Sequence, residues 1–238
     1  MKISLIGYGK MGKAIEEIAL ARGHKISFRV DVDNENDLAR LSPENTEVAI
    51  EFTHPAAAYK NIEACILQRV PVISGTTGWL DKKSGIETLC LRQGGTFFHA
   101  SNFSIGVNIF FRINEIVAGI MKNYPSYVIG VTEIHHTEKK DAPSGTAISL
   151  AGGIISKREE LKRWTLDESG DSSSIRIEAI REGKVPGTHI IRYQSGEDKI
   201  ELKHEAFSRK GFAVGAVMVA EWIKGKSGVL SMKDFLDI

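Results

Sequence analysis

Apolar and polar positions follow two styles along the chain, and the first style covers residues 1–104. Strand-like apolar runs occupy 3–7, 25–31, 47–52, 70–74 and 96–100, and amphipathic helical patterns occupy 10–23, 55–69 and 81–93. Short strands that alternate with helices are typical of βαβ units. The pattern predicts a Rossmann-like domain with a parallel sheet covered by helices, in which the short stretch 32–46 is a loop in place of one helix.

The second style begins after residue 104. A long helical pattern at 107–124 precedes a strand pattern at 126–136, a helical pattern at 146–161 and strand patterns at 175–182, 188–195 and 199–207. Polar or glycine-rich segments separate the last three runs, which predicts an antiparallel meander. An apolar helix at 213–226 has no strand pattern of its own nearby, so we expect it to pack on the first domain.

These patterns predict an α/β fold with two domains. Residues 1–104, completed by the C-terminal segment 210–238, form the Rossmann-like parallel-sheet domain. Residues 105–209 form an α+β domain with a mainly antiparallel sheet.

Composition narrows the classes of function. The 31 basic and 30 acidic residues of the 238-residue chain give a net charge of +1, and the basic residues are scattered, so we expect no nucleic-acid partner. Cys65 and Cys90 fall inside apolar helical patterns without ligand spacing, which indicates buried free thiols and no metal site. No apolar run approaches the roughly 18 residues of a membrane span, so we expect a cytoplasmic protein with no membrane partner.

A glycine-rich turn joins the first predicted strand to the first predicted helix. Gly7, Gly9 and Gly12 form a GxGxxG pattern, which permits a tight turn, close approach of a pyrophosphate and close packing of helix on strand. Asp31 ends the second strand, where an acid accepts hydrogen bonds from the adenosine ribose. Glycines and acids are also common in ordinary turns, but the strand, the helix and the acid together predict a dinucleotide site.

The residues after Asp31 bear on the choice of nucleotide. Val32 and Asp33 follow it, and no arginine stands there. A 2′-phosphate would therefore meet carboxylates instead of a fixed cation. We predict that NADH is used at least as well as NADPH.

Two more small, polar turns follow predicted strands at their carboxyl ends, where open α/β sheets bind ligands. They are GTTGW at 75–79 and ASNFSIG at 100–106. Gly75, Thr76, Thr77 and Asn102 have backbone, hydroxyl and amide groups suited to the nicotinamide ribose or carboxamide. The alternative is that these residues only cap strand-to-helix turns.

The stretch EIHHTEKKDAPSGTA, residues 133–147, is richest in candidate chemistry. Successive side chains of a strand point to opposite faces, so His135 and His136 serve one site only if the strand ends there. In the loop that follows, Lys139 can curl back beside His135. The next helix start leaves the N–H groups of residues 144–146 unpaired, and such groups beside a lysine suit a carboxylate. The alternative is a solvated polar loop.

This stretch resembles the signature of the dihydrodipicolinate reductases, also called 4-hydroxy-tetrahydrodipicolinate reductases, of the diaminopimelate route to lysine. The family pattern HHxxKxDAPSGTA is matched at each specified position. Nearly the whole chain shares the resemblance, through GYGKMG, IEFTHP, GTTGW, ASNFSIGVN, VPGTH, HEAFSR and GVLSMKDFLDI. It implies a dinucleotide-binding domain, a domain for substrate binding and oligomerisation, and a homotetramer.

The resemblance also implies roles for residues. His135 and Lys139 match the catalytic proton-transfer positions. His136, Gly145 and Thr146 match positions that bind a dicarboxylate substrate. Arg209 is a further candidate for a substrate carboxylate, and the alternative is an exposed arginine at a helix start. The implied cofactor positions are Gly7, Tyr8, Gly9, Lys10, Met11, Gly12, Asp31, Gly75, Thr76, Thr77, Ala100, Ser101, Asn102 and Phe103.

The chain departs from the family pattern at two positions. Ile6 stands where many members have an extra glycine, which leaves the expectation of cofactor binding in place. Val32 stands where many members have an arginine, which weakens the expectation of NADPH use.

The implied reaction is the NAD(P)H-dependent reduction of 4-hydroxy-tetrahydrodipicolinate to tetrahydrodipicolinate, with hydride delivered to C4 of the ring and protonation by Lys139 or His135. Two alternatives stay open at this point. One is another two-domain NAD(P)-dependent dehydrogenase of small carboxylates, and the other is a regulator that senses NADH without turnover.

Overall fold

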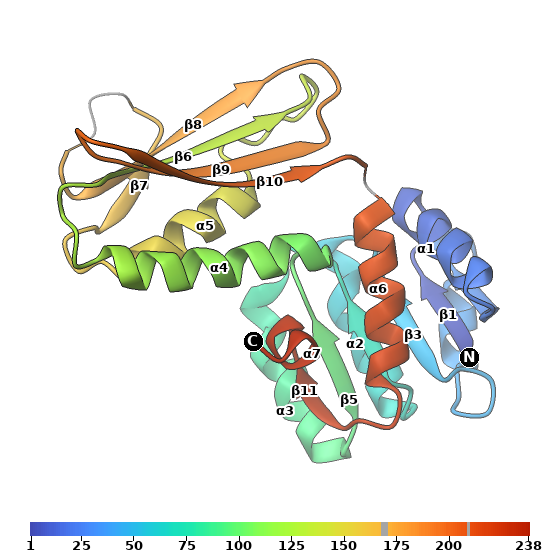
Figure 1. Cartoon of the computed structure of the whole chain (residues 1–238). Coiled ribbons are helices and arrows are strands. Elements are labelled where there is room, and N and C mark those ends of the chain that lie inside the picture. The colour runs from blue at the N-terminus through green and yellow to red at the C-terminus, as the bar shows by residue number, and fades with distance from the viewer. Residues whose placement is uncertain (168–170, 209) are drawn as a thin grey trace. The chain divides into compact units, whose positions relative to one another are not determined.

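Two separate sheets organise the chain (Figure 1). The computed structural model describes residues 1–167, 171–208 and 210–238. Unit 1 comprises residues 1–105 and 210–238, and unit 2 comprises residues 106–209. Within the described ranges, no helix is both long and apolar enough to cross a membrane.

Unit 1 is built on a six-stranded sheet in the order β11-β5-β4-β3-β1-β2, and every pairing is parallel. Its strands are β1 (Lys2–Ile6), β2 (Lys25–Val30), β3 (Val48–Glu51), β4 (Val72–Ser74), β5 (Thr96–His99) and β11 (Gly228–Leu230). Its helices are α1 (Lys10–Ala21), η1 (Val32–Arg40), α2 (Pro55–Leu67), η2 (Leu80–Lys82), α3 (Lys83–Gln93), α6 (Lys210–Ile223) and α7 (Met232–Leu236).

Helices cover both faces of this sheet, which explains the nearly continuous apolar runs of its strands. Ile3 and Leu5 of β1 pack in one core with α1 and α6, whereas Ile6 packs in the other core with α2 and α3. This division follows from the alternation of side chains along a strand. Cys65 and Cys90 are buried free thiols of the second core, as predicted.

The C-terminal segment returns to unit 1. As expected, α6 packs there, and its closest neighbour among the helices is α1. The helical pattern did not reveal β11, a three-residue strand that adds to the edge of the sheet beside β5. A run this short carries no periodic signal, so only its pairing partner identifies it.

The expected loop at 32–46 is wrong in part, because a 3₁₀ helix, η1, fills its first half. Asp31 caps this helix. Its carboxylate accepts a hydrogen bond from the Val32 N–H at 2.9 Å, and its own N–H donates to the Asn34 side chain at 2.7 Å. These two reciprocal hydrogen bonds stabilise the start of η1, whose sequence has few apolar residues to bury.

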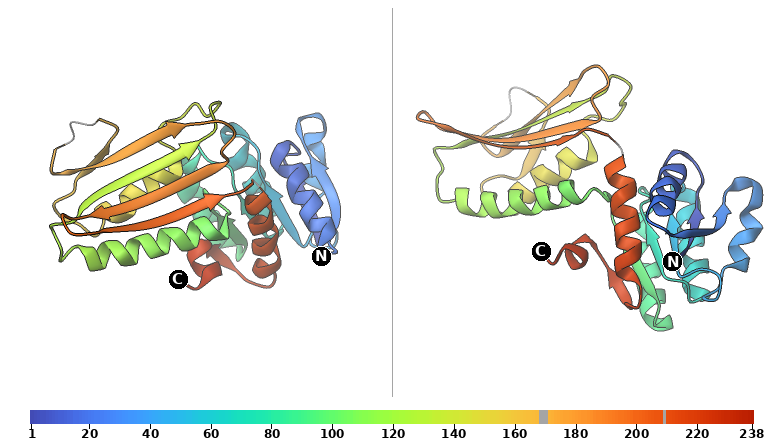
Figure 2. Two further views of the ribbon diagram at one scale, coloured as in Figure 1. Left: turned by 45° about the horizontal axis from the view of Figure 1, so that its top comes forward. Right: turned by 45° about the vertical axis from the view of Figure 1, so that its right-hand side comes forward.

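Unit 2 is an α+β domain with a five-stranded sheet in the order β10-β9-β6-β8-β7. Its strands are β6 (Val128–His135), β7 (Arg163–Thr165), β8 (Ser174–Arg181), β9 (Gly187–Gln194) and β10 (Lys199–Ala206). Helices α4 (Ile105–Met121) and α5 (Gly145–Ile155) lie on one face of this sheet, and no described helix of unit 2 covers the other face (Figure 2).

The α/β fold class is confirmed, but the antiparallel meander is wrong in part. Strands β9 and β10 pair antiparallel as predicted, whereas β8 does not pair with β9. Strand β6 lies between β8 and β9, parallel to β8 and antiparallel to β9, and β7 is parallel to β8. The reason is the loop 182–186, which crosses the end of β6. There the Glu182 N–H donates to the His135 carbonyl at 2.7 Å, and the His136 N–H donates to the Val185 carbonyl at 2.8 Å. The loop therefore closes directly over the histidine pair.

Close packing of α6 against the 100–106 turn makes a specific prediction. A Cβ atom added at Gly215 would lie 1.8 Å from the Phe103 carbonyl oxygen. Because this oxygen belongs to the backbone, the helix or the turn would have to shift to make room. We expect Gly215→Ala to lower the free energy of unfolding by about 1–3 kcal/mol, the usual cost of overpacking. Thermal unfolding followed by calorimetry measures this.

Gly211→Ala is the matched control in the same helix, because its added Cβ would approach only the Ser104 hydroxyl, at 3.9 Å. It should unfold at or slightly above the wild-type temperature. Equal melting temperatures for the two variants would contradict the packing argument.

Candidate active site

The glycine turn of unit 1 has the geometry that a dinucleotide motif requires. Gly7 has φ +93°, and a Cβ there would lie 2.0 Å from the Phe52 carbonyl oxygen. A Cβ on Gly12 would lie 2.2 Å from the Gly7 carbonyl oxygen, so this glycine lets α1 approach the turn. Gly9 has nothing within 4 Å of such a Cβ. The first and third glycines are thus needed by the fold, and the middle one leaves an open approach to the backbone.

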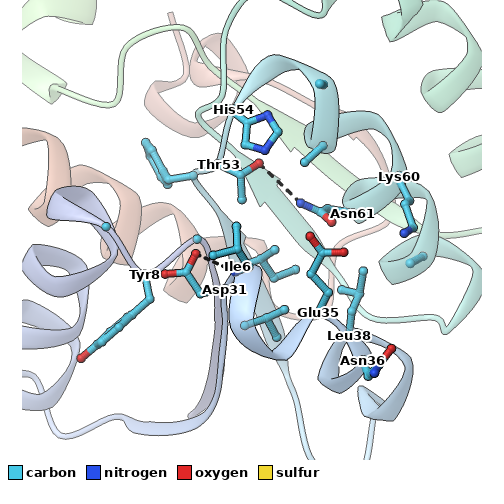
Figure 3. Close-up of a pocket in the computed structure, with 18 of the residues that line it drawn as sticks. Ile6, Tyr8, Asp31, Glu35, Asn36, Leu38, Thr53, His54, Lys60 and Asn61 are labelled. Carbon is cyan, nitrogen blue, oxygen red and sulfur yellow. Dashed lines mark hydrogen bonds between the residues drawn. The ribbon is translucent and has the colours of Figure 1, made fainter.

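A cavity of about 750 Å³ lies beside this turn, at the carboxyl ends of β1 and β2. The carboxylates of Asp31 and Glu35 line it, and His54, Lys60 and Asn61 line it from α2 and its N-cap (Figure 3). The cavity has apolar walls and a few polar groups, as nucleotide pockets do. Glu35 is a second acid of this pocket that the motif did not predict.

A second hollow of about 390 Å³ shares Gly9, Phe52 and Thr53 with the first. It brings together candidate residues from the glycine turn and from the GTTGW turn. These are Gly9, Lys10, Met11, Gly75, Thr76 and Thr77. Gly75 is required here because a Cβ would lie 2.1 Å from the Phe52 ring.

Glu51 is a buried acid that was not predicted from the sequence as part of a site. It ends β3 with no solvent exposure, and it accepts hydrogen bonds from the hydroxyls of Ser74 at 2.5 Å and Thr76 at 2.8 Å. The N–H and hydroxyl of Thr53 also donate to it. Glu51 therefore joins the ends of β3 and β4 and fixes the orientation of Thr76. The sequence contained a signal for this residue, because Glu51 is the one charged residue of the otherwise apolar strand β3.

Other predicted cofactor residues have side chains that serve packing. The Tyr8 hydroxyl donates to Glu16, which also pairs with Arg29, and the ring points away from the cavity (Figure 3). Ala100 and Phe103 are buried in the core of unit 1. Asn102 accepts a hydrogen bond from the Ser104 N–H, and Ser101 is exposed. Tyr8, Ala100 and Phe103 can therefore meet a ligand through their backbone only.

In unit 2, β6 ends at His135, as a shared role for the two histidines requires. His135 is 8% exposed, and a Cβ on Gly187 would lie 2.9 Å from its ring. The ring of His189 makes an edge contact with it at a centroid distance of 5.2 Å. His136 follows beyond the strand end and lines a separate cavity of about 500 Å³ together with Lys184 and Pro186.

The carboxylate of Glu133 lies behind His135, two residues earlier on the same face of β6. It is fully buried, accepts hydrogen bonds from Arg181 at 2.9 Å and from the Ser144 N–H at 3.0 Å, and lies 3.6 Å from the His135 ring nitrogen Nε2. Glu133, Arg181 and His189 were not predicted from the sequence as site residues. The spacing of Glu133 and His135 was the available signal for the first of these.

Lys139 lies in the loop after β6, and its N–H donates to the His136 carbonyl in a turn. Its ammonium group bonds to both carboxylate oxygens of Asp141 at 2.8 Å. Arg181 constrains the same loop, because its guanidinium donates a hydrogen bond to the Asp141 carbonyl oxygen at 2.6 Å. The lysine is thus a charged group held on a braced loop.

The start of α5 differs from expectation at one position. Ser144 is the N-cap, and its N–H is bonded to Glu133, so it is not free for a ligand. The Ser144 hydroxyl accepts from the Ala147 N–H at 3.2 Å. Gly145 and Thr146 stand in the first turn, where a helix provides no acceptor for their N–H groups. Arg209, the remaining substrate candidate, lies outside the described residues.

The electrostatics of this site follow from burial. Burial alone would raise the pKa of Glu133, but hydrogen bonds from Ser144 and Arg181 outweigh it and hold the pKa below its usual range. Burial lowers the pKa of His135, against the opposing attraction of Glu133. Burial lowers the pKa of His189 to about 4, with a contribution from His135. At neutral pH Glu133 is thus ionised and His189 is neutral.

Glu133, His135 and His189 place three ligand-type atoms within 4.8 Å of one another, the spacing of a candidate metal site. The carboxylate, however, already has a guanidinium and a backbone N–H as partners. A metal ion would compete with the positive charge of Arg181 at close range. We therefore interpret the three residues as an ionised carboxylate with two close imidazole rings, and not as a metal site.

The fold and the two sites define a class of protein. A parallel sheet with a GxGxxG turn and an acid-lined cavity is the architecture of a nicotinamide-nucleotide enzyme. A histidine, a lysine on a braced loop and a helix start are the residue types that suit proton transfer and anion binding. Together they describe a two-domain oxidoreductase that acts on an anionic substrate.

Comparisons with known proteins identify the family. The model of the dihydrodipicolinate reductase N-terminus matches residues 1–103, and that of the C-terminus matches residues 106–236. The 4-hydroxy-tetrahydrodipicolinate reductase of Christiangramia forsetii is 50% identical over 99% of this chain and 98% of its own length. That of Archaeoglobus fulgidus is 34% identical over the full length of both chains.

A solved structure supports the fold. A dipicolinate-bound dihydrodipicolinate reductase from Paenisporosarcina sp. TG-14 superposes with a TM-score of 0.80 at 18% identity, covering 99% of both chains. The chain therefore belongs to the dihydrodipicolinate reductase family and is an NAD(P)H-dependent oxidoreductase of lysine biosynthesis. The resemblance and the enzyme class predicted from sequence are confirmed.

Proposed function

We propose that this protein reduces 4-hydroxy-tetrahydrodipicolinate to tetrahydrodipicolinate in the cytoplasm. The substrate loses water, and the conjugated imine that results accepts a hydride from the nicotinamide at C4 of the ring and a proton from the enzyme. The observation that carries the proposal is the segment 133–147, which brings a histidine at the end of β6, a lysine in the following loop and the start of α5 into one short stretch. Both halves of the chain match the reductase family.

Unit 1 binds the nucleotide in this proposal. The pyrophosphate lies on the N–H groups of the glycine turn, at the start of α1. The adenosine ribose bonds to Asp31 in the larger cavity. The nicotinamide end meets the hollow formed with Thr77 and with Thr76, and Glu51 fixes the orientation of Thr76. The bound nucleotide supplies the hydride, and the protein supplies position and charge.

Unit 2 binds the dicarboxylate and moves the proton. The N–H groups of Gly145 and Thr146, with His136, hold carboxylate oxygens. Arg209 remains a candidate for the same task. Lys139 donates the proton as negative charge develops on the ring, and His135 donates or relays it. Charged donors fixed in advance stabilise such a transition state at little reorganisation cost.

The first prediction from this proposed function concerns Lys139. General acid assistance is typically worth roughly 10²- to 10⁴-fold, so Lys139→Ala should lower kcat by about that factor. Affinity for NADH, measured by fluorescence titration, should hardly change, because the nucleotide site lies on unit 1. Turnover is followed through NADH absorbance, with substrate generated in place from pyruvate and aspartate semialdehyde by the preceding synthase.

Lys140→Ala is the matched control, since Lys140 is the exposed neighbour in the same loop. It should keep the wild-type kcat. A Lys139→Ala enzyme with full activity would remove Lys139 from the mechanism. Wild-type protein that binds NADH without oxidising it would instead indicate a sensor.

The second prediction concerns the nucleotide. Asp31 and Glu35 both face the larger cavity, Val32 replaces a cation, and the nearby Arg29 is already paired with Glu16. A 2′-phosphate would therefore meet more repulsion than attraction, although Lys60 also lines the cavity. The ratio of kcat/KM for NADH to that for NADPH should be one or more. A strong preference for NADPH would contradict this assignment.

The third prediction concerns assembly. The side chains of four isoleucines form an exposed apolar stripe on α4, from 41% to 57% exposed: Ile109, Ile113, Ile116 and Ile120. In addition, no described helix of unit 2 covers one face of the unit 2 sheet. We propose that further copies of this chain cover these surfaces in a homotetramer. Light scattering should give four times the chain mass of 26.2 kDa.

Ile116→Lys should lower that mass, because a charge in an apolar interface is costly. Leu91→Lys, at an exposed leucine on α3 of unit 1, should leave it unchanged. A wild-type monomer would refute the assembly without affecting the proposed reaction.

A further inference from the structure

The Glu133 carboxylate has no access to solvent, yet three segments converge on it. Arg181 reaches it from the end of β8, the Ser144 N–H from the start of α5, and His135 from its own strand. Because its exposed fraction is zero, it cannot touch a substrate from where it lies. Any effect on the reaction must act through its neighbours.

Arg181 extends this connection to the loop that carries Lys139. One of its terminal nitrogens bonds both to Glu133 at 2.9 Å and to the Asp141 carbonyl at 2.6 Å, and a longer contact of 3.4 Å reaches the Lys139 carbonyl. Bonds from a guanidinium to fixed carbonyls constrain backbone, not only side chains. One ion pair thus connects the histidine to the lysine loop.

The His135 ring has little freedom to turn. Its Nε2 atom has no hydrogen-bond partner in the described part of the chain and faces Glu133 at 3.6 Å, while the backbone of Pro186 bonds to the ring. Gly187 and His189 fill the remaining space. A proton on Nε2 would point toward an ionised carboxylate.

We propose that Glu133 and Arg181 are positioning residues of the reductase, a buried ion pair that orients His135 and holds the Lys139 loop for proton transfer. This inference rests on the proposed function, because it assigns the pair to that reaction. Neither residue contacts the substrate.

The charges around His135 act in opposite directions. Glu133 favours the protonated ring, whereas Lys139 and Arg181 disfavour it, and Asp141 partly neutralises Lys139. His189 is the other titratable ring in contact, and it is neutral near pH 7. Removing Glu133 should therefore lower the pKa of His135, and removing Arg181 should raise it. Loss of the local fold would instead move the pKa of His135 in the same direction in both variants, toward its usual value.

The experiment titrates His135 by NMR in the unliganded protein, using Glu133→Gln and Arg181→Met, with the His135 signal assigned by its loss in His135→Gln. The pKa of His135 should fall in the first variant and rise in the second. The alkaline limb of the kcat profile, where a protonated His135 is lost, should move in the same two directions.

In both variants kcat should fall roughly 10- to 100-fold, as expected for a small misplacement of reacting groups, while affinity for NADH is retained. Arg181→Lys, which keeps the charge but makes fewer bonds, should recover part of the loss. Glu205→Gln is the control for net charge, because it removes the same charge as Glu133→Gln from an exposed ion pair with Lys203 on β10. It should change neither the pKa of His135 nor kcat.

Shifts in one common direction, or no shift in either variant, would overturn the proposal. If Glu133→Gln fails to fold, the rise expected for Arg181→Met decides alone. The NMR titration needs no turnover, so a wild-type protein without reductase activity would refute the proposed function while this test could still be read.

Discussion

A single buried carboxylate, Glu133, organises the chemistry-bearing end of unit 2. A charge removed from water is tolerated only when it is paired and hydrogen-bonded. Glu133 meets that condition through Arg181 and the Ser144 N–H, which come from β8 and from the start of α5. Satisfying the charge therefore forces three distant segments to meet. These segments meet at the end of β6, where His135 lies.

Unit 1 uses the same device at its own sheet. Glu51 is also fully buried, and hydroxyls from β4 and the following turn satisfy it. The bonds order the carboxyl ends of β3 and β4, where an open α/β sheet binds its ligand. In both units a buried acid at a strand end ties together the segments that carry the candidate site residues. Such acids contribute position, because their own oxygens are fully used.

Much of this architecture could be predicted from the sequence. The βαβ repetition identified the parallel sheet, and Gly7 and Gly12 are required by contacts below 3 Å, as their motif suggested. The strand end at His135 also followed from the pattern. The place of β6 between β8 and β9 could not be predicted, because the strand order depends on the path of loop 182–186 across the end of β6. Likewise, β11 is too short to have a period of its own.

The candidate site divides in the same way. Side-chain chemistry and local spacing are encoded along the chain, so the HHxxKxDAPSGTA segment alone indicated a histidine, a lysine and a helix start acting together. Whether a polar side chain is free or engaged depends on residues far away in the sequence. Arg181 and His189 join the cluster only because β8 and β9 flank β6, and Ser144 loses its free N–H to Glu133. Partners and burial are properties of the folded chain, because they arise from contacts between segments that the sequence keeps apart.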